Sequence, residues 1–368
     1  MSRYTNTDAI PGAFNRQSDG SKSLMNVSQH RTHTTEIKAR ARELGFDACG
    51  IATADDADPQ DLLGTWLSKG FHADMHWMHR SRHLRQDVSL KLPGAKSVIV
   101  LARNYYSPRP KQRPGTGKVA TYAWGRDYHR VLKKPLRRLA GFINDSIPSS
   151  ESYCSVDSGP VLERTWAARA GVGAIGKNSL VLRRDLGSWF FLGTIITTAE
   201  LVPDAPVNDL CGTCTRCIDA CPTAAIVEPY VVDSRKCISY HTIENRGDVS
   251  KELSPHFEDW IFGCDICQEV CPWNRFARIT SEPDFLPRAG NANLDPDEIL
   301  REDEAAFNAR FEGTPIRRAK YTGMVRNAIT VKNNDAREDR AVDQSSGSPE
   351  TAGSGFCESA VVNKSTIS

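Results

Sequence analysis

The alternation of polar and apolar positions divides the chain into an ordered middle and two polar ends. Residues 1–34 and 333–368 are polar and show no periodicity, so we expect a disordered extension and a disordered tail there. Between them, stretches with helical spacing alternate with short runs of apolar and β-branched residues. The spacing predicts helices over 36–44, 61–69, 130–144 and 158–170, and strands over 46–51, 97–102 and 188–198.

This order of elements predicts an α+β protein with three ordered parts. Helices alternate with strands over residues 35–205, which favours one α/β or α+β domain. Residues 206–280 form a cysteine-rich module, and residues 281–332 have mainly helical spacing. We therefore expect two domains followed by a short helical segment.

The composition of the chain indicates its compartment and the role of its cysteines. No stretch approaches the roughly 18 apolar residues of a spanning helix, and no signal peptide is visible, so we expect a cytoplasmic protein without a membrane partner. Lys and Arg number 47 against 45 Asp and Glu, a net charge of only +2. The 11 cysteines are many for a chain without an export signal, and in a reducing compartment they are more typical of metal ligands than of disulfides.

The cysteine spacing predicts two iron–sulfur clusters. One run follows the CxxCxxCxxxCP pattern of bacterial ferredoxins, in which three thiolates bind one [4Fe–4S] cluster and the fourth binds another. A shorter CxxCxxxCP run follows, and Cys237 is the available substitute for the cysteine that this run lacks. The crossed arrangement assigns the first cluster to Cys211, Cys214, Cys217 and Cys271, and the second cluster to Cys221, Cys237, Cys264 and Cys267.

A zinc site built from CxxC pairs is the alternative, and it fits poorly because the first run places three ligands on one tight loop. Of the remaining cysteines, Cys49 and Cys154 are expected in the core, and Cys357 lies in the polar tail. Two clusters would make a short path for electrons. The larger domain that precedes them should therefore hold an electron acceptor.

The N-terminal domain is locally basic. Residues 72–138 contain 16 Lys or Arg but only 3 Asp or Glu, with Trp and Tyr interleaved. This mixture is typical of surfaces that bind RNA or an anionic cofactor, and a solvated face is the alternative. On a helix, His72, His76, His79 and His83 would share one face, which we interpret as a solvated or phosphate-facing stripe rather than a zinc site.

A carboxylate at a turn is the best candidate for catalysis. Asp157 lies in the sequence VDSGP over residues 156–160, directly before a predicted helix. It either caps that helix or is an acid held beside a reaction centre. The glycine-rich stretch 171–176 brings bare backbone close to another group, but it is not the GxGxxG-after-a-strand pattern of a nicotinamide site.

Several motifs together make the chain resemble the epoxyqueuosine reductase family. They are LPGAKSV at 92–98, YAWGRDYH at 122–129, DSGP at 157–160 with Glu163-Arg164, AARAG at 167–171, IGKN at 175–178 and GSWF at 187–190. The match includes the distant Cys237 and covers about residues 36–332. The resemblance implies a cobalamin-binding α/β domain similar to that of reductive dehalogenases, then a bacterial ferredoxin-like module with two [4Fe–4S] clusters and a short helical segment.

The resemblance also implies an activity. The protein would be an oxidoreductase that reduces epoxyqueuosine to queuosine at the wobble position of tRNA with a GUN anticodon, the last step of queuosine biosynthesis. Electrons would come from an external low-potential donor and pass through the clusters to cobalamin, in a protein expected to be monomeric. Cobalamin would bind without a histidine lower ligand, and the sequence after Asp127 agrees because it lacks the DxHxxG motif.

The matched motifs imply roles for individual residues. Asp157 would be the proton donor. The residues around the corrin would be Arg80, Asp157, Val181, Leu192, Ser239, Cys264 and Asp265, and the residues that contact tRNA phosphates would be Arg317, Arg318 and Lys320. Residues 310–332 hold six Lys or Arg against one acid, which fits that role.

The chain departs from the family pattern after Lys332. Family members commonly continue into HEAT-like repeats, so part of the tRNA-binding surface would be missing or supplied differently. Three alternatives are a cobalamin- and iron–sulfur-dependent reductase of the dehalogenase type acting on a small molecule, an electron-transfer ferredoxin with a fused structural domain, and a cobalamin-binding protein that does not bind RNA. Salt-sensitive tRNA binding would distinguish the last of these.

Overall fold

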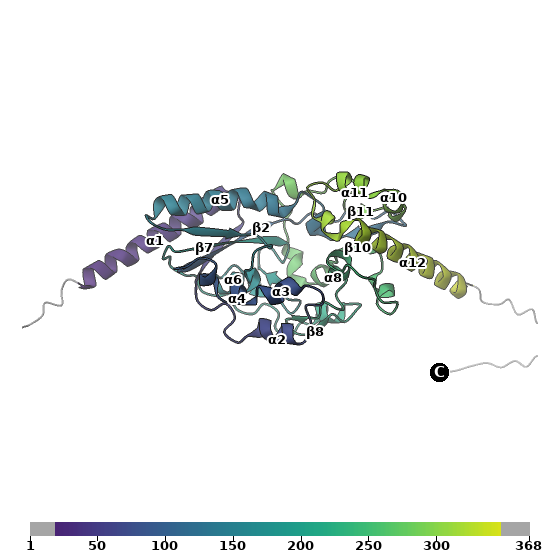
Figure 1. Ribbon diagram of the computed structural model, residues 1–368, viewed down its shortest axis with the longest axis horizontal. Helices are drawn as coiled ribbons and strands as arrows, with labels where there is room; N and C mark the ends of the chain where they lie inside the picture. Colours follow the sequence, from purple (N-terminus) through teal and green to yellow (C-terminus); the bar gives the residue numbers. More distant parts are fainter. Residues whose placement is uncertain (1–18, 347–368) are drawn as a thin grey trace, which may run out of the picture.

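A computed structural model describes residues 19–346 of the protein, with side chains over 28–337 (Figure 1). Its main sheet is antiparallel, with the strand order β1-β2-β7-β4. The strands are β1 (Ala48–Thr53), β2 (Ser97–Asn104), β4 (Ser152–Ser155) and β7 (Phe190–Thr197). The three strands predicted from the sequence are confirmed, and β4 was not predicted.

Helices cover both faces of this sheet, so the protein has the α+β fold expected (Figure 1). On one face lie α1 (Asp19–Glu43) and α5 (Tyr128–Ser146), and on the other lies α6 (Glu163–Arg169). Four apolar residues of α5 at helical spacing are fully buried against the sheet, namely Leu132, Leu136, Leu139 and Ile143. Alternate residues of β2 face the two sides, because Ile99 packs with α5 and Val100 packs with α6.

Apart from α12, which has 27 residues, the other helices and strands are short. The helices are α2 (Leu62–Ser68), α3 (His76–Arg80), α4 (Arg82–Gln86), α7 (Arg216–Asp219), α8 (Ile238–Ile243), α9 (Ile266–Glu269), α10 (Pro296–Arg301), α11 (Glu304–Arg310) and α12 (Lys320–Ser346). The strands are β3 (Gly117–Val119), β5 (Ala174–Ile175), β6 (Val181–Leu182), β8 (Ile226–Glu228), β9 (Val231–Val232), β10 (Trp260–Phe262) and β11 (Asn293–Leu294). Among the described residues, no helix is both long and apolar enough to cross a membrane.

A second sheet connects the three parts that the sequence suggested. Its central strand, β3, comes from the N-terminal part and pairs in parallel with β10 of the cysteine-rich module. On its other side it pairs with β11 of the C-terminal segment. The predicted boundaries at residues 205 and 280 therefore divide the chain in sequence but not its packing.

Two predictions about the ends were wrong. The first helix begins at Asp19, before the predicted start at Glu36, and α12 continues past Lys332 to Ser346. A few contacts anchor these helices: Thr34 Oγ1 accepts a hydrogen bond from the Val202 N–H, and the Asn334 amide donates to two carbonyl oxygens. Once anchored, a helix extends at little cost through polar sequence. Residues 1–18 and 347–368, including Cys357, lie outside the described residues.

One predicted helix is shorter than expected, and the four histidines of the stripe are not on a single helix. The helix predicted over 158–170 begins only at Glu163, because Asp157 takes up a positive φ of 54° and the chain turns before α6. The four histidines do not lie on one helix, since α3 ends at Arg80 and α4 begins after Ser81.

Candidate active site

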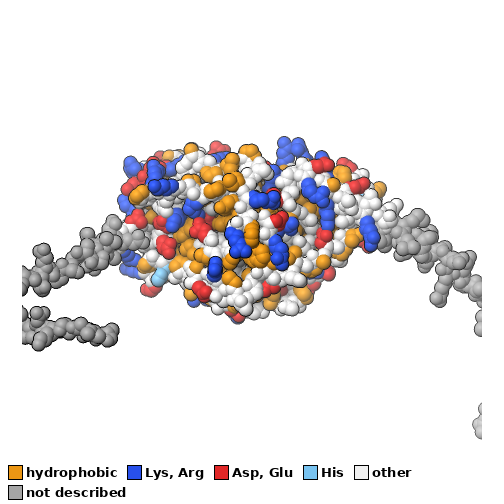
Figure 2. All heavy atoms as spheres, turned by 180° about the vertical axis from the view of Figure 1, so that it is seen from behind, with side chains coloured by type: hydrophobic (Ala, Val, Ile, Leu, Met, Phe, Trp, Pro, Cys, Tyr) orange, Lys and Arg blue, Asp and Glu red, His pale blue; other side chains and the backbone are white. Residues whose placement is uncertain are grey.

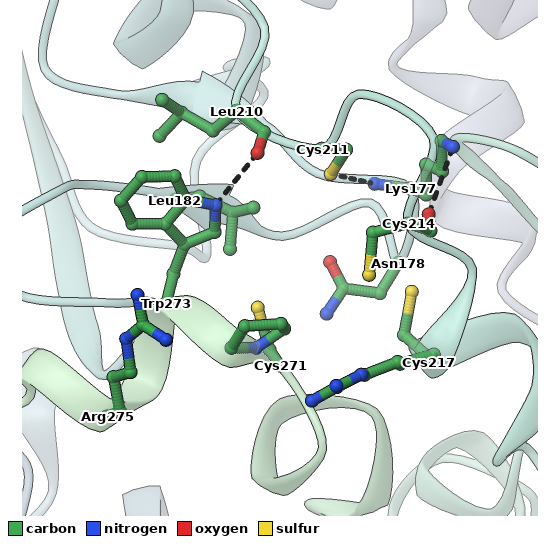
Figure 3. Close-up of a pocket in the computed structure, with 12 residues that line it drawn as sticks. Lys177, Asn178, Leu182, Leu210, Cys211, Cys214, Cys217, Cys271, Trp273 and Arg275 are labelled. Carbon is green, nitrogen blue, oxygen red and sulfur yellow. Dashed lines mark hydrogen bonds between the residues drawn. The ribbon is translucent and has the colours of Figure 1, made fainter.

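Four cysteine thiols line one cavity of about 220 Å³ (Figure 3). They are the four that the crossed arrangement assigned to the first cluster, namely Cys211, Cys214, Cys217 and Cys271. The first three lie on the loop before α7 and on α7 itself, whereas the fourth lies after α9. The backbone N–H of Lys177 points at the Cys211 sulfur, at an N–S distance of 3.4 Å.

The other four cysteines form a deeper group. Burial raises the pKa of the Cys264 thiol well above its ordinary value, and the neighbouring Cys267 and Cys237 raise it further. Burial also raises the pKa of Cys267, with Cys237, Cys217 and Cys221 among the nearby groups that add to it. Cys217 belongs to the first group, so the two groups adjoin each other.

Loops of the N-terminal part hold the cysteine module in place. The Asn178 side chain donates a hydrogen bond to the Cys267 carbonyl oxygen (3.2 Å), and the Ser188 N–H donates to Asn274 Oδ1 (2.7 Å). Gly187 has a positive φ of 64°, and a Cβ there would lie 2.0 Å from the same Asn274 oxygen. The glycine of the GSWF motif therefore permits close packing beside Cys271.

The donor set fits iron–sulfur clusters better than a single metal ion. Buried thiols with raised pKa values stay neutral unless a metal compensates the charge of the thiolate. Within residues 28–337, no three His, Cys, Asp or Glu side chains converge as the ligands of one ion would. Two [4Fe–4S] clusters would use eight thiolates, one for each iron atom, and the two cysteine groups together contain eight.

The Asp157 carboxylate lies on a strained loop between β4 and α6. Its φ of 54° is in the left-handed region, which costs a residue other than glycine about 1–3 kcal/mol. Glu163 holds the loop, because the Asp157 N–H donates to Glu163 Oε1 (2.9 Å) and Oε2 (3.0 Å). Asp157 is thus fixed by the first residue of α6 and does not cap that helix itself, which leaves its side chain available for chemistry.

Tyr128 and His129 at the start of α5 contact the Asp157 side chain. Tyr128 Oη donates to Asp157 Oδ2 at 2.6 Å, and His129 Nε2 lies 3.5 Å from the same oxygen. The other ring nitrogen of His129 is 2.8 Å from an Asp127 carboxylate oxygen. Sequence reasoning assigned no role to Tyr128 or His129, although both lie in the YAWGRDYH motif.

These contacts set the protonation of the site. Partial desolvation by the surrounding protein raises the pKa of Asp157, although its side chain is 65% exposed, but the hydrogen bonds from His129 and Tyr128 outweigh this and hold that pKa below its usual value. Burial lowers the pKa of His129, and the Asp127 and Asp157 carboxylates more than reverse this, to about 9. At neutral pH the site therefore contains an ionised Asp157 beside a protonated His129.

Glu163 is the second unusual acid. Burial and the charge of Asp157 raise its pKa to about 8, although Ser155 and the Asp157 N–H donate hydrogen bonds to it. Glu163 is therefore largely protonated at neutral pH. A neutral Glu163 accepts the Asp157 N–H without placing a second negative charge beside the Asp157 carboxylate.

Several residues expected around the corrin lie near Tyr122. Burial raises the pKa of Tyr122, and the charges of Asp157, Glu244 and Asp265 raise it further, so both predicted aspartates lie close to it. Glu244 also binds the Arg318 guanidinium through two hydrogen bonds of 2.8 Å each. Arg318 lies 5.6 Å from the Trp77 ring on α3, the helix that carries Arg80.

The remaining predicted corrin residues differ in exposure. Arg80 is exposed, and Ser239 on α8 and Leu192 on β7 are half-buried. Val181 is 4% exposed and packs in the apolar core around α6. Asp265 is 2% exposed and accepts hydrogen bonds from Arg109 (2.9 Å) and from the Thr121 N–H (2.7 Å) and hydroxyl (2.8 Å), so one of its oxygens has a structural role.

The environment of His129 fits a cobalamin site without a histidine ligand. Asp127 holds one ring nitrogen and Asp157 faces the other, so neither is free to bind cobalt. The Asp157 side chain is itself 65% exposed, which leaves room for a bound group on that side.

The basic C-terminal segment is less available than its composition suggested. Arg310 pairs with Glu298 (3.0 Å) and also with Glu302, Lys332 pairs with Asp297, and Arg326 donates to carbonyl oxygens. Arg318 is held by Glu244, as described above. Of the three predicted tRNA contacts, Arg317 and Lys320 are exposed and have no carboxylate partner among the described side chains.

Much of the free positive charge of residues 72–138 lies on α5. Five cations line one open groove along this helix, namely Arg130, Lys133, Lys134, Arg137 and Arg138. The helix begins beside the C-terminal segment, since the Asp127 N–H donates to the Gly313 carbonyl oxygen (2.8 Å). On the face opposite to Figure 1, several Lys and Arg side chains surround apolar ones near the centre (Figure 2).

Two family models match parts of the chain. A family model described as "4Fe-4S double cluster binding domain" matches residues 210–274, which confirms the prediction of two clusters. A second, described as "Epoxyqueuosine reductase QueG, DUF1730", matches residues 85–158, from α4 to Asp157.

Relatives and solved structures extend the match to most of the chain. The epoxyqueuosine reductase of Gloeobacter violaceus is 46% identical over 80% of this chain and 93% of its own length. A crystal structure of epoxyqueuosine reductase with an epoxyqueuosine-modified stem loop of tRNA-Tyr has a TM-score of 0.74 at 29% identity, covering 82% of this chain and 81% of that one. The Bacillus subtilis enzyme, with its catalytic aspartate loop swung out of the active site, has a TM-score of 0.75 at 27% identity, covering 84% and 83%. The chain therefore belongs to the epoxyqueuosine reductase family.

Proposed function

We propose that this protein reduces epoxyqueuosine to queuosine in tRNA, in the cytoplasm, with two [4Fe–4S] clusters and cobalamin as its cofactors. Removal of the epoxide oxygen to leave a carbon–carbon double bond consumes two electrons and two protons and releases water. The observation that carries the proposal is the cavity lined by four cysteine thiols, with the deeper cysteine group adjoining it, together with the Asp157 carboxylate held by Tyr128 and His129. The solved family member with a modified tRNA stem loop supports tRNA as the substrate.

The eight cysteines would hold the clusters in the crossed arrangement. The four thiols around the cavity would bind one cluster, and the deeper group with Cys237 would bind the other. Arg80, Asp157, Ser239, Cys264 and Asp265 would surround cobalamin, with Val181 and Leu192 behind them. When bound, these cofactors supply the electrons for the removal of the epoxide oxygen.

The protein's own contribution is a proton and a fixed geometry. Because hydrogen bonds from His129 and Tyr128 lower the pKa of Asp157, this residue is ionised at neutral pH and does not itself store the proton. We assign the stored proton to His129, which carries it below about pH 9. Asp157 would face the substrate and pass that proton on, while Tyr128 and Glu163 hold the Asp157 carboxylate and backbone in place.

The tRNA would bind across two basic elements. Arg317 and Lys320 would contact phosphates, and the cations of α5 would extend this surface. Arg318 would face the reaction site instead, because its pKa is raised by Glu244 and also by the nearby charges of Asp157 and Tyr128. The monomeric state implied by the family resemblance stays a prediction.

A single-turnover reaction tests the proposed function. The protein is loaded anaerobically with iron, sulfide and cobalamin, reduced with dithionite and mixed with an epoxyqueuosine-modified tRNA stem loop. We expect nucleoside analysis to show queuosine in place of epoxyqueuosine. When cobalamin is omitted, we expect epoxyqueuosine to persist. Persistence of epoxyqueuosine with the fully loaded protein would contradict the proposal.

A further inference from the structure

The rim of the outer cysteine cavity carries a set of free cations. Lys177, Arg216 and Arg275 line the cavity, and the Arg184 guanidinium lies 5.3 Å from the ring of Trp273, which also lines it (Figure 3). The three arginines are exposed, and none has a carboxylate partner among the described side chains. Lys177 Nζ donates to the carbonyl oxygens of the cysteine loop at Gly212 (2.7 Å) and Cys214 (3.0 Å).

Nearby acids do not pair with the three arginines of this rim. Asp209 accepts hydrogen bonds from the N–H groups of Cys211 (2.9 Å) and Gly212 (3.0 Å), and Asp219 accepts one from the Thr215 hydroxyl (2.7 Å). Asp185, the neighbour of Arg184 in sequence, pairs with Arg183 (2.7 Å). The arginines therefore present their charge to the solvent.

Apolar surface accompanies these cations. Phe276 is 44% exposed and lies under the Arg275 guanidinium at 4.6 Å, and Tyr230, 44% exposed, has its backbone N–H bonded to the Lys177 carbonyl oxygen (2.9 Å). Exposed aromatic side chains interleaved with arginines are typical of protein–protein interfaces. A ring of cations around an apolar patch is complementary to a protein that presents carboxylates.

The position of this rim indicates what such a partner would deliver. The outer cysteine group adjoins the deeper one through Cys217 and Cys267, and the deeper group contains Cys264, next to Asp265 near the Asp157 site. The rim therefore surrounds the outer cysteine group, which is separated from the reaction site by the deeper cysteine group. An RNA that reacts at Asp157 does not have to contact this rim. A protein that delivers electrons to the outer cysteine group would have to dock against it.

We propose that this surface, formed by Arg184, Arg216, Arg275 and the exposed Phe276, is the docking site of an acidic one-electron carrier protein of the flavodoxin or ferredoxin class. The inference rests on the proposed function, in which each epoxide takes two electrons. Two reduced carriers must then dock in succession, each losing one electron to the protein, while two protons come from the protein and solvent and one water leaves. Electrostatic attraction would speed each encounter.

Charge reversal tests this surface. The variant Arg184→Glu/Arg216→Glu/Arg275→Glu is compared with Lys111→Glu/Arg113→Glu/Lys251→Glu, which changes the same charge at exposed cations that do not line the cavity. The association rate of each cofactor-loaded protein with an immobilised acidic flavodoxin is measured over a salt series. At low salt we expect the association rate of the rim variant to be at least about tenfold lower than that of the wild type, and to depend much less on salt. The control variant should keep the wild-type association rate and its salt dependence.

Two further measurements separate this inference from the proposed function. Iron content and dithionite-driven reduction of the tRNA stem loop are measured for each variant, and flavodoxin association is compared only between proteins with the same iron content, since dithionite needs no docking site and reports on the clusters and the reaction site alone. Three results would overturn the docking site while leaving the proposed activity intact. The rim variant could associate with flavodoxin as fast as the wild type, the control variant could lose as much association rate as the rim variant, or the wild type could fail to associate. A loss of stem-loop affinity in the rim variant instead would assign the surface to RNA and also overturn it.

Discussion

Replacement of Asp157 by Asn tests how the protein delivers a proton. In the structure, Asp157 Oδ2 accepts a hydrogen bond from Tyr128 at 2.6 Å and lies 3.5 Å from His129 Nε2. The amide has the same size and still accepts from Tyr128, but it can neither carry the proton nor stabilise the imidazolium. We expect single-turnover reduction to slow by about 10²–10⁴-fold, while iron and cobalamin contents stay at wild-type levels.

The pH dependence adds a second test of the same assignment. His129 has a pKa raised to about 9, so it holds its proton below that value and loses it as the pH rises through it. The wild-type rate should therefore fall as the pH rises through about 9. Asp127→Asn is the matched control, because it removes one of the two carboxylates that raise the pKa of His129 but leaves Asp157 in place, and Asn is also a good helix N-cap.

Rapid-quench single-turnover kinetics across the neutral and alkaline range are the assay, with the imidazole titration followed by NMR. We expect Asp127→Asn to shift the alkaline loss of rate to lower pH without the large loss at neutral pH. Wild-type rates in Asp157→Asn would refute the role of Asp157. An unchanged pH profile in Asp127→Asn, despite a lowered pKa of His129, would refute the proton store at His129.

Three further predictions concern the clusters, the RNA surface and the core. In Cys237→Ala, iron after anaerobic loading should fall from about eight to about four atoms per chain, and unchanged iron with unchanged paramagnetic resonance spectra would refute the crossed arrangement. Arg317→Ala/Lys320→Ala should lower the slope of log affinity for the tRNA stem loop against log salt by about 0.7–0.9 per lost phosphate contact, and an identical slope would exclude this segment from the interface. Leu136→Ala should reduce the free energy of unfolding by about 2–5 kcal/mol in denaturant titrations, because this fully buried α5 side chain packs against the sheet; a loss well below that range would show that α5 contributes little to the core.

The sequence predicted features that depend on short-range patterns. The three long strands are runs of apolar residues, and the two iron–sulfur clusters follow from cysteine spacing, because both signals are local. The grouping of Cys271 with the first cysteine run, 50 or more residues away, came from the crossed pattern of bacterial ferredoxins, and the structure does place Cys271 at the same cavity. Helix α5 was found because its buried leucines repeat at helical spacing.

Features that depend on tertiary contacts were missed. The pKa of Asp157 depends on Tyr128 and His129, which lie nearly 30 residues earlier and meet it only in the folded chain. The number of unpaired cations in segment 310–332 was overestimated, because a sequence does not show which of them pair with Glu298 or Glu244 in the folded chain. The polar ends of α1 and α12 were not predicted, because their sequences have no apolar periodicity. Each of these ends is anchored by a few hydrogen bonds to distant parts of the chain, which the sequence does not show.

Nucleoside analysis of cellular tRNA tests the central claim most directly. Wild-type protein and the variants Asp157→Asn and Cys237→Ala are expressed in cells that accumulate epoxyqueuosine because they lack their own reductase, and tRNA nucleosides are separated and weighed by mass spectrometry. We predict that the wild-type protein converts epoxyqueuosine to queuosine and that both variants leave epoxyqueuosine in place at comparable protein levels. Epoxyqueuosine that persists with wild-type protein containing both clusters and cobalamin would contradict the account.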